Sequence, residues 1–189
     1  MIKKVLIILF ICLVGVAGAL IYKKPYSHRI SLSSPTPKLN IATNRPEILD
    51  IPSIDVHANV ESVGLDAQNR MDIPKNWDNV AWYNLGPHPG AAGNSVIDGH
   101  VDTTTGAPAV FARLSELKEG DTITVVEGNI THMFRVTSLE AFDTNNFPLQ
   151  RVFGSSDSSY LNLITCDGIW NKDVKSYSKR LVVFSKLIK

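Results

Sequence analysis

The sequence has 189 residues, of which 44% are hydrophobic and 20% are charged, an ordinary composition for a globular protein. Its formal net charge is +1, with 19 basic against 18 acidic side chains, so no overall field attracts nucleic acid or an acidic polymer. These values exclude a strongly basic nucleic-acid-binding protein and leave room for one domain behind the N-terminus.

The N-terminal run from Val5 to Tyr22 contains no charged residue. At about 1.5 Å per residue, a helix of this length spans about 27 Å, close to the bilayer's hydrocarbon core of about 30 Å. Residues 1–24 are therefore predicted to form a membrane anchor, with the rest of the chain outside the cytoplasm. A cleaved signal peptide is the alternative, because Ala17-Gly18-Ala19 has the small residues that a signal peptidase prefers.

Residues 25–45 are rich in Ser, Pro and Thr, which predicts a semi-extended linker. In residues 46–189, short apolar runs separated by Gly, Pro, Asn and Asp predict a mainly β domain, a closed eight-stranded barrel with one or two short helices. The predicted strands are Glu47–Ile54, Asn59–Leu65, Ala81–Tyr83, Asn94–Val101, Thr122–Glu127, His132–Ala141, Tyr160–Cys166 and Arg180–Leu187. A helix is predicted over Pro108–Leu117, where Val110, Leu114 and Leu117 share one face.

The strand predicted over Tyr160–Cys166 brings a cysteine to its last position, before an expected turn at Asp167-Gly168. The other cysteine, Cys12, lies in the apolar N-terminal run, so Cys166 is predicted to be a free thiol. A lone cysteine is most often a small buried hydrophobe. Outside the cytoplasm, however, most cysteines form disulfides, so an unpaired cysteine there is a candidate catalytic nucleophile.

The order of three residues along the chain resembles that of the sortases: His100 near a strand end, then Thr165-Cys166, then Arg180 at a strand start. The resemblance covers roughly residues 46–187. Within it, three phrases look most like the class D, E and F branch, with class F nearest: Gly99-His100-Val101-Asp102, Pro108-Ala109-Val110-Phe111 and Leu163-Ile164-Thr165-Cys166. One position departs from the pattern, because the family usually has Thr four residues before the cysteine and this chain has Asn162.

The resemblance implies a cysteine transpeptidase on a sortase-type barrel at the outer face of a Gram-positive-type cell membrane. Cys166 would be the nucleophile, His100 would exchange protons with the thiol and the leaving amine, and Arg180 would stabilise the oxyanion. The implied substrate is an LPXTG-type sorting signal of a secreted surface protein, cleaved between Thr and Gly. The acceptor would be an amine of a peptidoglycan precursor or a pilin lysine, and the chemistry requires no cofactor.

Four further residues are candidates for substrate contact. Thr165 is one because the matching threonine of sortases lies at the substrate groove, and Ile164 shares a strand face with Cys166. Asp102 either orients His100 or caps the turn that follows. Trp170, between the Cys and Arg strands, either covers the site or anchors its loop. By the same resemblance, the long loop of residues 143–159 would cradle the Leu-Pro part of the signal.

Several alternatives stay open at this point. Asp98, His100 and Asp102 alternate along one predicted strand, so they share a face and could bind a metal ion. The sequence does not indicate which residues would be the further ligands. Arg113 and Arg151 could replace Arg180 as the catalytic cation. Two other functions are compatible with the sequence: a cysteine peptidase that hydrolyses its substrate, and an inactive extracytoplasmic β-barrel that binds cell-wall polymer or a partner protein. The remaining histidines are interpreted as surface residues: His28, His57, His88 and His132.

Overall fold

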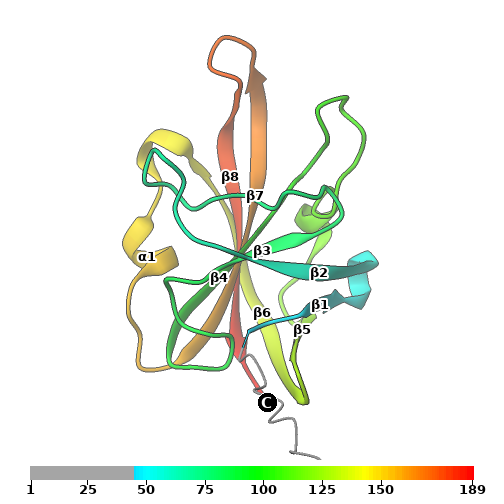
Figure 1. The fold of residues 1–189 in the computed structure, drawn as a ribbon, viewed down its shortest axis with the longest axis vertical. Helices are drawn as coiled ribbons and strands as arrows, with labels where there is room; N and C mark the ends of the chain where they lie inside the picture. Colours follow the sequence, from blue (N-terminus) through cyan, green and yellow to red (C-terminus); the bar gives the residue numbers. More distant parts are fainter. Residues whose placement is uncertain (1–44) are drawn as a thin grey trace, which may run out of the picture. The chain divides into compact units, whose positions relative to one another are not determined.

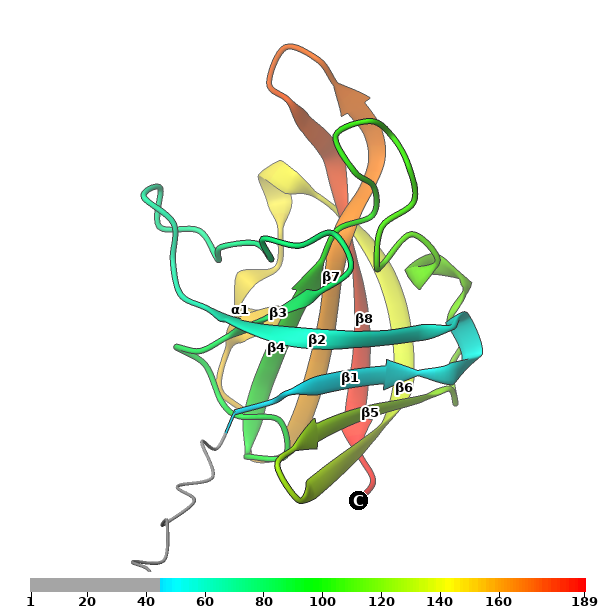
Figure 2. The same ribbon diagram turned by 45° about the vertical axis from the view of Figure 1, so that its right-hand side comes forward.

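The computed structural model of the chain describes residues 45–189. They form a closed barrel with the strand order β1-β2-β3-β4-β7-β8-β6-β5, which confirms the predicted eight-stranded fold (Figures 1 and 2). The strands are β1 (Ile48–Ile51), β2 (Val56–Val63), β3 (Val80–Tyr83), β4 (Gly93–Gly99), β5 (Thr122–Glu127), β6 (Ile130–Asp143), β7 (Ser159–Asn171) and β8 (Ser176–Leu187). The helical segments are α1 (Leu149–Phe153) and the 3-10 turns η1 (Pro52–Ile54), η2 (Leu114–Glu116) and η3 (Thr144–Asn146).

Most neighbouring strands pair antiparallel, but β2 with β3 and β4 with β7 pair parallel. Parallel strands end at the same edge of a sheet, so the residues that follow β4 lie beside the later part of β7. Closure of the barrel gives every strand two partners and leaves no long edge open to pairing with another chain. The β7–β8 hairpin projects beyond the barrel, at the end where the connection from β4 also emerges (Figures 1 and 2).

Side-chain alternation divides the apolar residues between two faces of the barrel wall. The interior is filled by residues such as Leu49, Ile97 and Phe134, none of which is exposed. A second cluster lies on the outer face of β4, β7 and β8 under α1, and it consists of Val96, Val152, Ile164, Val182 and Phe184. The outer face of β4, β7 and β8 is therefore packed against α1.

The helix predicted over Pro108–Leu117 is reduced to the single turn η2. The reason is that backbone groups in this stretch bond to distant partners. The amide of Val110 donates to Trp77 O at 3.0 Å, and that of Phe111 donates to His100 O at 2.8 Å. Donors used in this way cannot bond within a helix, so the prediction of a longer helix was wrong.

The expected turn at Asp167-Gly168 is a β-bulge, because β7 continues to Asn171 and its pairing with β8 shifts register between Asp167 and Trp170. Gly168 adopts a φ of 82°, in the left-handed region that glycine enters without strain. A side chain there would also place its Cβ 2.4 Å from Ser178 Oγ. Cys166 thus lies inside a long hairpin and not at the end of a strand.

Two histidines interpreted as surface residues flank a buried carboxylate at the β5–β6 turn. Glu127 is 8% exposed, and its two oxygens lie 3.4 Å from His88 Nδ1 and 3.2 Å from His132 Nε2. His88 also packs against Trp82, with ring centroids 4.6 Å apart. The prediction of surface positions is confirmed for His57 and His88, whose side chains are 73% and 44% exposed, and is wrong for His132, which is 17% exposed because it lies against Glu127 across the turn.

The predicted membrane anchor of residues 1–24, His28 and nearly all of the predicted linker lie outside the described residues. Within residues 45–189, no helix has both the length and the apolar character needed to cross a bilayer.

Candidate active site

Cys166 lies on the outer face of β7, where it is a partly exposed free thiol. Ile164 shares this face and belongs to the outer apolar cluster, as the strand alternation predicted. In the β7–β8 pairing, Cys166 stands directly opposite Arg180. The thiol and the guanidinium therefore come from facing positions of one hairpin, which brings together two of the predicted site residues.

His100 reaches the other side of Cys166 through the parallel pairing of β4 with β7. The register runs to Asp98 opposite Ile164, and the hydroxyl of Thr165 then donates to Gly99 O at 2.7 Å. The next position on each strand is His100 and Cys166. Cys166 and Arg180 are consequently opposite each other on β7 and β8, and His100 directly follows the end of β4, the neighbour of β7 on its other side.

The imidazole of His100 is held by residues that precede β3. Its Nε2 lies 2.9 Å from Pro74 O, and since a carbonyl only accepts, Nε2 carries the hydrogen. The ring packs against Trp77, with centroids 4.4 Å apart. A neutral ring in this tautomer leaves Nδ1 free to take up and return a proton. Pro74 and Trp77 could not be identified from the sequence, because they lie in the connection between β2 and β3, which has no periodic pattern.

The glycine before His100 has a packing role. A Cβ at Gly99 would lie 2.5 Å from the ring of Phe111, which is 1% exposed. Phe111 also donates its amide hydrogen to His100 O at 2.8 Å. The close approach of these two segments fixes the backbone of His100, and a larger residue at Gly99 would separate them.

The side chain of Arg180 is oriented by hydrogen bonds to acceptors of its own hairpin. Its guanidinium donates to the carbonyls of Tyr177 at 3.2 Å and Lys179 at 2.9 Å, and to Ser176 Oγ at 3.4 Å. No carboxylate pairs with Arg180 among residues 45–189. The cation beside Cys166 thus keeps its full charge.

The two alternative cations are engaged elsewhere. Arg113 pairs with Asp55 at 2.7 Å and with Glu116 at 2.8 Å. Arg151, on α1, pairs with Glu140 and lies over the ring of Phe184. An arginine whose charge is neutralised by a carboxylate is poorly suited to an oxyanion, which favours Arg180 for that role.

The thiol lies among opposing charges. Burial raises the pKa of Cys166 above its ordinary value; Arg180 lowers it, and the carboxylates of Asp98 and Asp102 raise it further. Asp98 is itself affected, since burial raises its pKa to about 7 while Arg180 opposes that rise. The resting thiol is consequently protonated at neutral pH, and attack requires its proton to be removed.

Asp102 neither caps the next turn nor bonds to His100. It accepts a hydrogen bond from the phenol of Tyr177 at 2.5 Å, and this bond raises the pKa of Tyr177 to about 12. The turn is capped by Thr103, whose Oγ1 accepts from the amides of Thr105 and Ala107. Both expectations for Asp102 were wrong, because its partner lies 75 positions away on the β7–β8 hairpin.

The other two candidates for substrate contact differ in their surroundings. Thr165 is 2% exposed and uses its hydroxyl within the barrel, so it positions the end of β4 and does not line the outer face. Trp170 is 47% exposed and packs against Tyr177, with ring centroids 5.2 Å apart. This contact lies within the β7–β8 hairpin, and the choice between the two roles predicted for Trp170 stays a prediction.

The alternating residues Asp98, His100 and Asp102 do not form a metal site. Within residues 45–189, no group of three or more His, Cys, Asp or Glu side chains is arranged to hold a metal ion.

A family model described as the sortase domain matches residues 49–188. The chain belongs to the sortase family. No curated protein sequence matches it. Family membership supports the expectation of a cysteine transpeptidase.

Solved sortase structures share the fold of this chain at low identity. A sortase D transpeptidase of Clostridium perfringens is 20% identical, with a TM-score of 0.57, over 75% of this chain and 78% of that one. Sortase A of Listeria monocytogenes is 21% identical, with a TM-score of 0.57, over 75% and 86% of the two chains. Sortase C of Streptococcus pneumoniae is 21% identical, with a TM-score of 0.59, over 78% and 70%.

Asn162, where sortases usually have Thr, connects this sortase's barrel to α1. It is fully buried, and its Nδ2 donates to Val152 O at 2.8 Å and to Asn94 Oδ1 at 3.2 Å. Asn94 in turn donates to Gly154 O at 2.7 Å. The segment predicted as a loop over residues 143–159 thus contains α1, and paired carboxamides hold it to the outer face.

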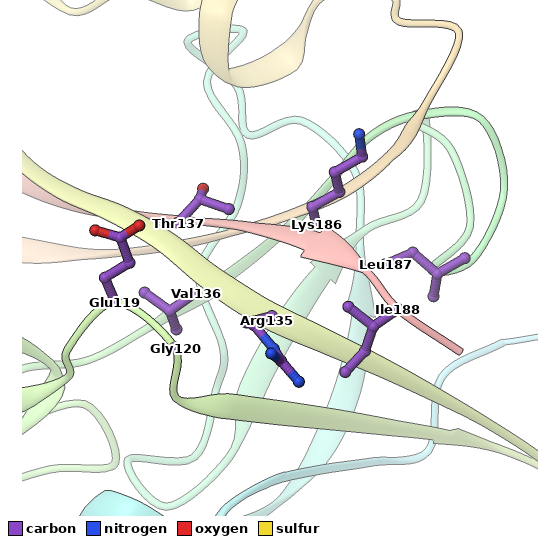
Figure 3. A pocket seen from close by; sticks show the side chains of 8 residues that line it. All are labelled: Glu119, Gly120, Arg135, Val136, Thr137, Lys186, Leu187 and Ile188. Carbon is purple, nitrogen blue, oxygen red and sulfur yellow. The ribbon is translucent and has the colours of Figure 1, made fainter.

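A hollow on another part of this sortase involves none of the predicted site residues (Figure 3). The side chains of Arg135 and Lys186 in it extend in opposite directions (Figure 3), so they do not converge on one anion. Its lining consists of Glu119, Gly120, Arg135, Val136, Thr137, Lys186, Leu187 and Ile188.

Proposed function

We propose that this sortase is a cysteine transpeptidase that cleaves an LPXTG-type sorting signal between Thr and Gly and transfers the new carboxyl end to an amine. The observation that carries the proposal is the row formed by His100 at the end of β4, Cys166 on β7 and Arg180 on β8. A thiol nucleophile, a proton carrier with a free ring nitrogen and an unpaired cation are the groups that acyl transfer needs.

The first half of the reaction makes a thioester. His100 Nδ1 takes the thiol proton as Cys166 Sγ attacks the threonine carbonyl carbon, and the donors of Arg180 stabilise the oxyanion. The C–N bond to glycine then breaks, and the imidazolium gives its proton to the leaving amine. The products of this half are the thioacyl enzyme and a peptide that begins with glycine.

The second half returns the enzyme to its starting state. An acceptor amine attacks the thioester carbonyl while His100 takes up the amine proton. The C–S bond breaks, the thiolate is protonated by the imidazolium, and a new amide is released. Each half is balanced without a cofactor, since the bond broken and the bond formed are both acyl bonds.

The acceptor, class and location complete the proposal. We expect an amine of a peptidoglycan precursor or a pilin lysine as acceptor, class F as the nearest branch, and attachment to the outer face of a Gram-positive-type cell membrane. The support for attachment is the uncharged run from Val5 to Tyr22. The support for class is the set of three phrases around His100, Phe111 and Cys166.

The test is intact-protein mass spectrometry of the full chain in detergent with a pool of LPXTG-type peptides. A mass gain equal to the peptide up to its Thr, absent in Cys166→Ala, is expected. Addition of an amine should then convert the adduct to a transfer product. If hydrolysis product forms at the same rate with and without the amine, the enzyme is a hydrolytic peptidase. If folded protein gains no mass with any peptide, the proposal fails in favour of a binding barrel.

A further inference from the structure

Tyr177, on β8, contacts two charged residues of this site, Asp102 and Arg180. Its phenol donates to Asp102 at 2.5 Å, and its backbone carbonyl accepts from the guanidinium of Arg180 at 3.2 Å. Arg180 stands opposite Cys166 across the hairpin, and the charges of Asp102 and Arg180 both act on the pKa of the thiol. A carboxylate and a guanidinium attract one another, but these two each bond to Tyr177 and form no ion pair.

We propose that Tyr177 is a positioning residue that holds the carboxylate of Asp102 away from Arg180, so that the guanidinium stays free for the oxyanion. The proposal rests on the proposed acyl transfer for its purpose but not for its test. The competition is between two donors for one carboxylate. The phenol keeps the carboxylate because the packing of Tyr177 against Trp170 holds the hydroxyl in a fixed position.

The position of the phenol is fixed by packing. The ring of Tyr177 lies against Trp170 with centroids 5.2 Å apart, and the two residues are paired across the hairpin. The bond to Asp102 also raises the pKa of Tyr177 to about 12, so the phenol remains a donor throughout the range in which the thiol titrates. The phenol is therefore protonated, and able to donate, at neutral pH.

Removal of the phenol hydroxyl leaves the carboxylate of Asp102 without its donor. Arg180 is a cation of the same hairpin and has no carboxylate partner among residues 45–189. Pairing of the two would offset the positive charge of the guanidinium. This raises the pKa of Cys166, because Arg180 lowers that pKa in the intact site.

The test measures the rate of Cys166 alkylation by iodoacetamide as a function of pH, using the full chain in detergent without any peptide. Tyr177→Phe should shift the alkylation profile to higher pH, and a shift of one pKa unit slows alkylation at pH 7 about tenfold. Asp102→Asn in the same background should reverse the shift, since a neutral amide does not neutralise Arg180. Tyr160→Phe, which removes a phenol at the far end of β7, is the matched control and should leave the profile unchanged.

A second readout uses turnover of a sorting peptide by variants that retain the near-ultraviolet circular dichroism of the parent. Tyr177→Phe should lower kcat about 10²-fold or more with little change in KM, because the lost interaction is made with the oxyanion. The added Asp102→Asn change should restore most of that loss.

Two outcomes overturn the proposal. Alkylation of Tyr177→Phe that follows the parent profile shows that the phenol does not control the charges around the thiol. A shift that Asp102→Asn fails to reverse shows that Tyr177 only supports the hairpin. Because alkylation needs no peptide, these results can be interpreted even if the chain forms no acyl enzyme.

Discussion

Replacement of Asp98 by Asn should stabilise the protein at neutral and higher pH. Burial raises the pKa of Asp98 from 3.8 to about 7, so the folded state holds a proton that the unfolded chain releases. Between these values the unfolded state binds fewer protons, and the free energy of unfolding falls as the pH rises. The full shift corresponds to about 4 kcal/mol above pH 7, and an uncharged amide of the same shape avoids this loss.

The assay is urea unfolding of the parent and the variant at pH 4 and pH 8. At pH 8, Asp98→Asn should have the greater free energy of unfolding, by up to about 4 kcal/mol, and at pH 4 the two proteins should be nearly equal. Asp157→Asn removes a carboxylate from an exposed position and should show no such difference. The variant should also alkylate faster at Cys166 above pH 7, because the charge of Asp98 raises the pKa of the thiol.

An equal difference between the parent and Asp98→Asn at both pH values would contradict this prediction. A pH-independent difference would mean that the substitution alters packing and that ionisation of Asp98 costs the folded state nothing. A difference of opposite sign at pH 8 would mean that the carboxylate is held by Arg180 strongly enough to outweigh burial.

Three further predictions concern the scaffold. Asn162→Ala should lower the free energy of unfolding by about 1–3 kcal/mol in urea, because buried carbonyl partners lose their donor; an unchanged midpoint would contradict this. Gly99→Ala should cost about 1–3 kcal/mol through its clash with Phe111, while Gly64→Ala, where a Cβ meets only open space and one atom at 3.8 Å, serves as its control. Arg151→Met should change thermal stability by less than about 1 kcal/mol, because its ion pair is half-exposed; a larger loss would show that the pair holds α1 in place.

The barrel could be predicted from the sequence because its strands carry local signals. The run Thr122–Glu127 alternates buried and half-buried residues, and its predicted bounds are those observed. The positions of His100, Cys166 and Arg180 in or beside strands could be predicted as well, since each lies in or beside a run of β-branched residues. Their arrangement in a row could not, because it depends on which strands become neighbours.

The segments that were predicted wrongly have one physical cause in common. Their local sequence suits two conformations, and contacts with residues distant in the chain determine which one forms. Asp167-Gly168 has the residue types of a hairpin turn, and a positive φ suits a turn or a bulge equally. Pairing with β8 selects the bulge. Likewise the stretch from Pro108 has a helical pattern, but Trp77 and His100 take its amide hydrogens. The bond between Tyr177 and Asp102 spans 75 positions and has no local signature.

The distances along the chain between the three reactive residues set the order in which the site assembles during folding. Cys166 and Arg180 belong to one hairpin, whereas His100 joins them only through pairing of β4 with β7, where Gly99 and Thr165 are 66 positions apart. Local pairings close small loops and form sooner than distant ones. We therefore expect the fluorescence of Trp170 to reach its final value before catalysis returns during refolding, and the reverse order would contradict this. Until β4 pairs with β7, Cys166 lies beside Arg180 but not beside His100, so the chain has a thiol with a neighbouring cation and no general base.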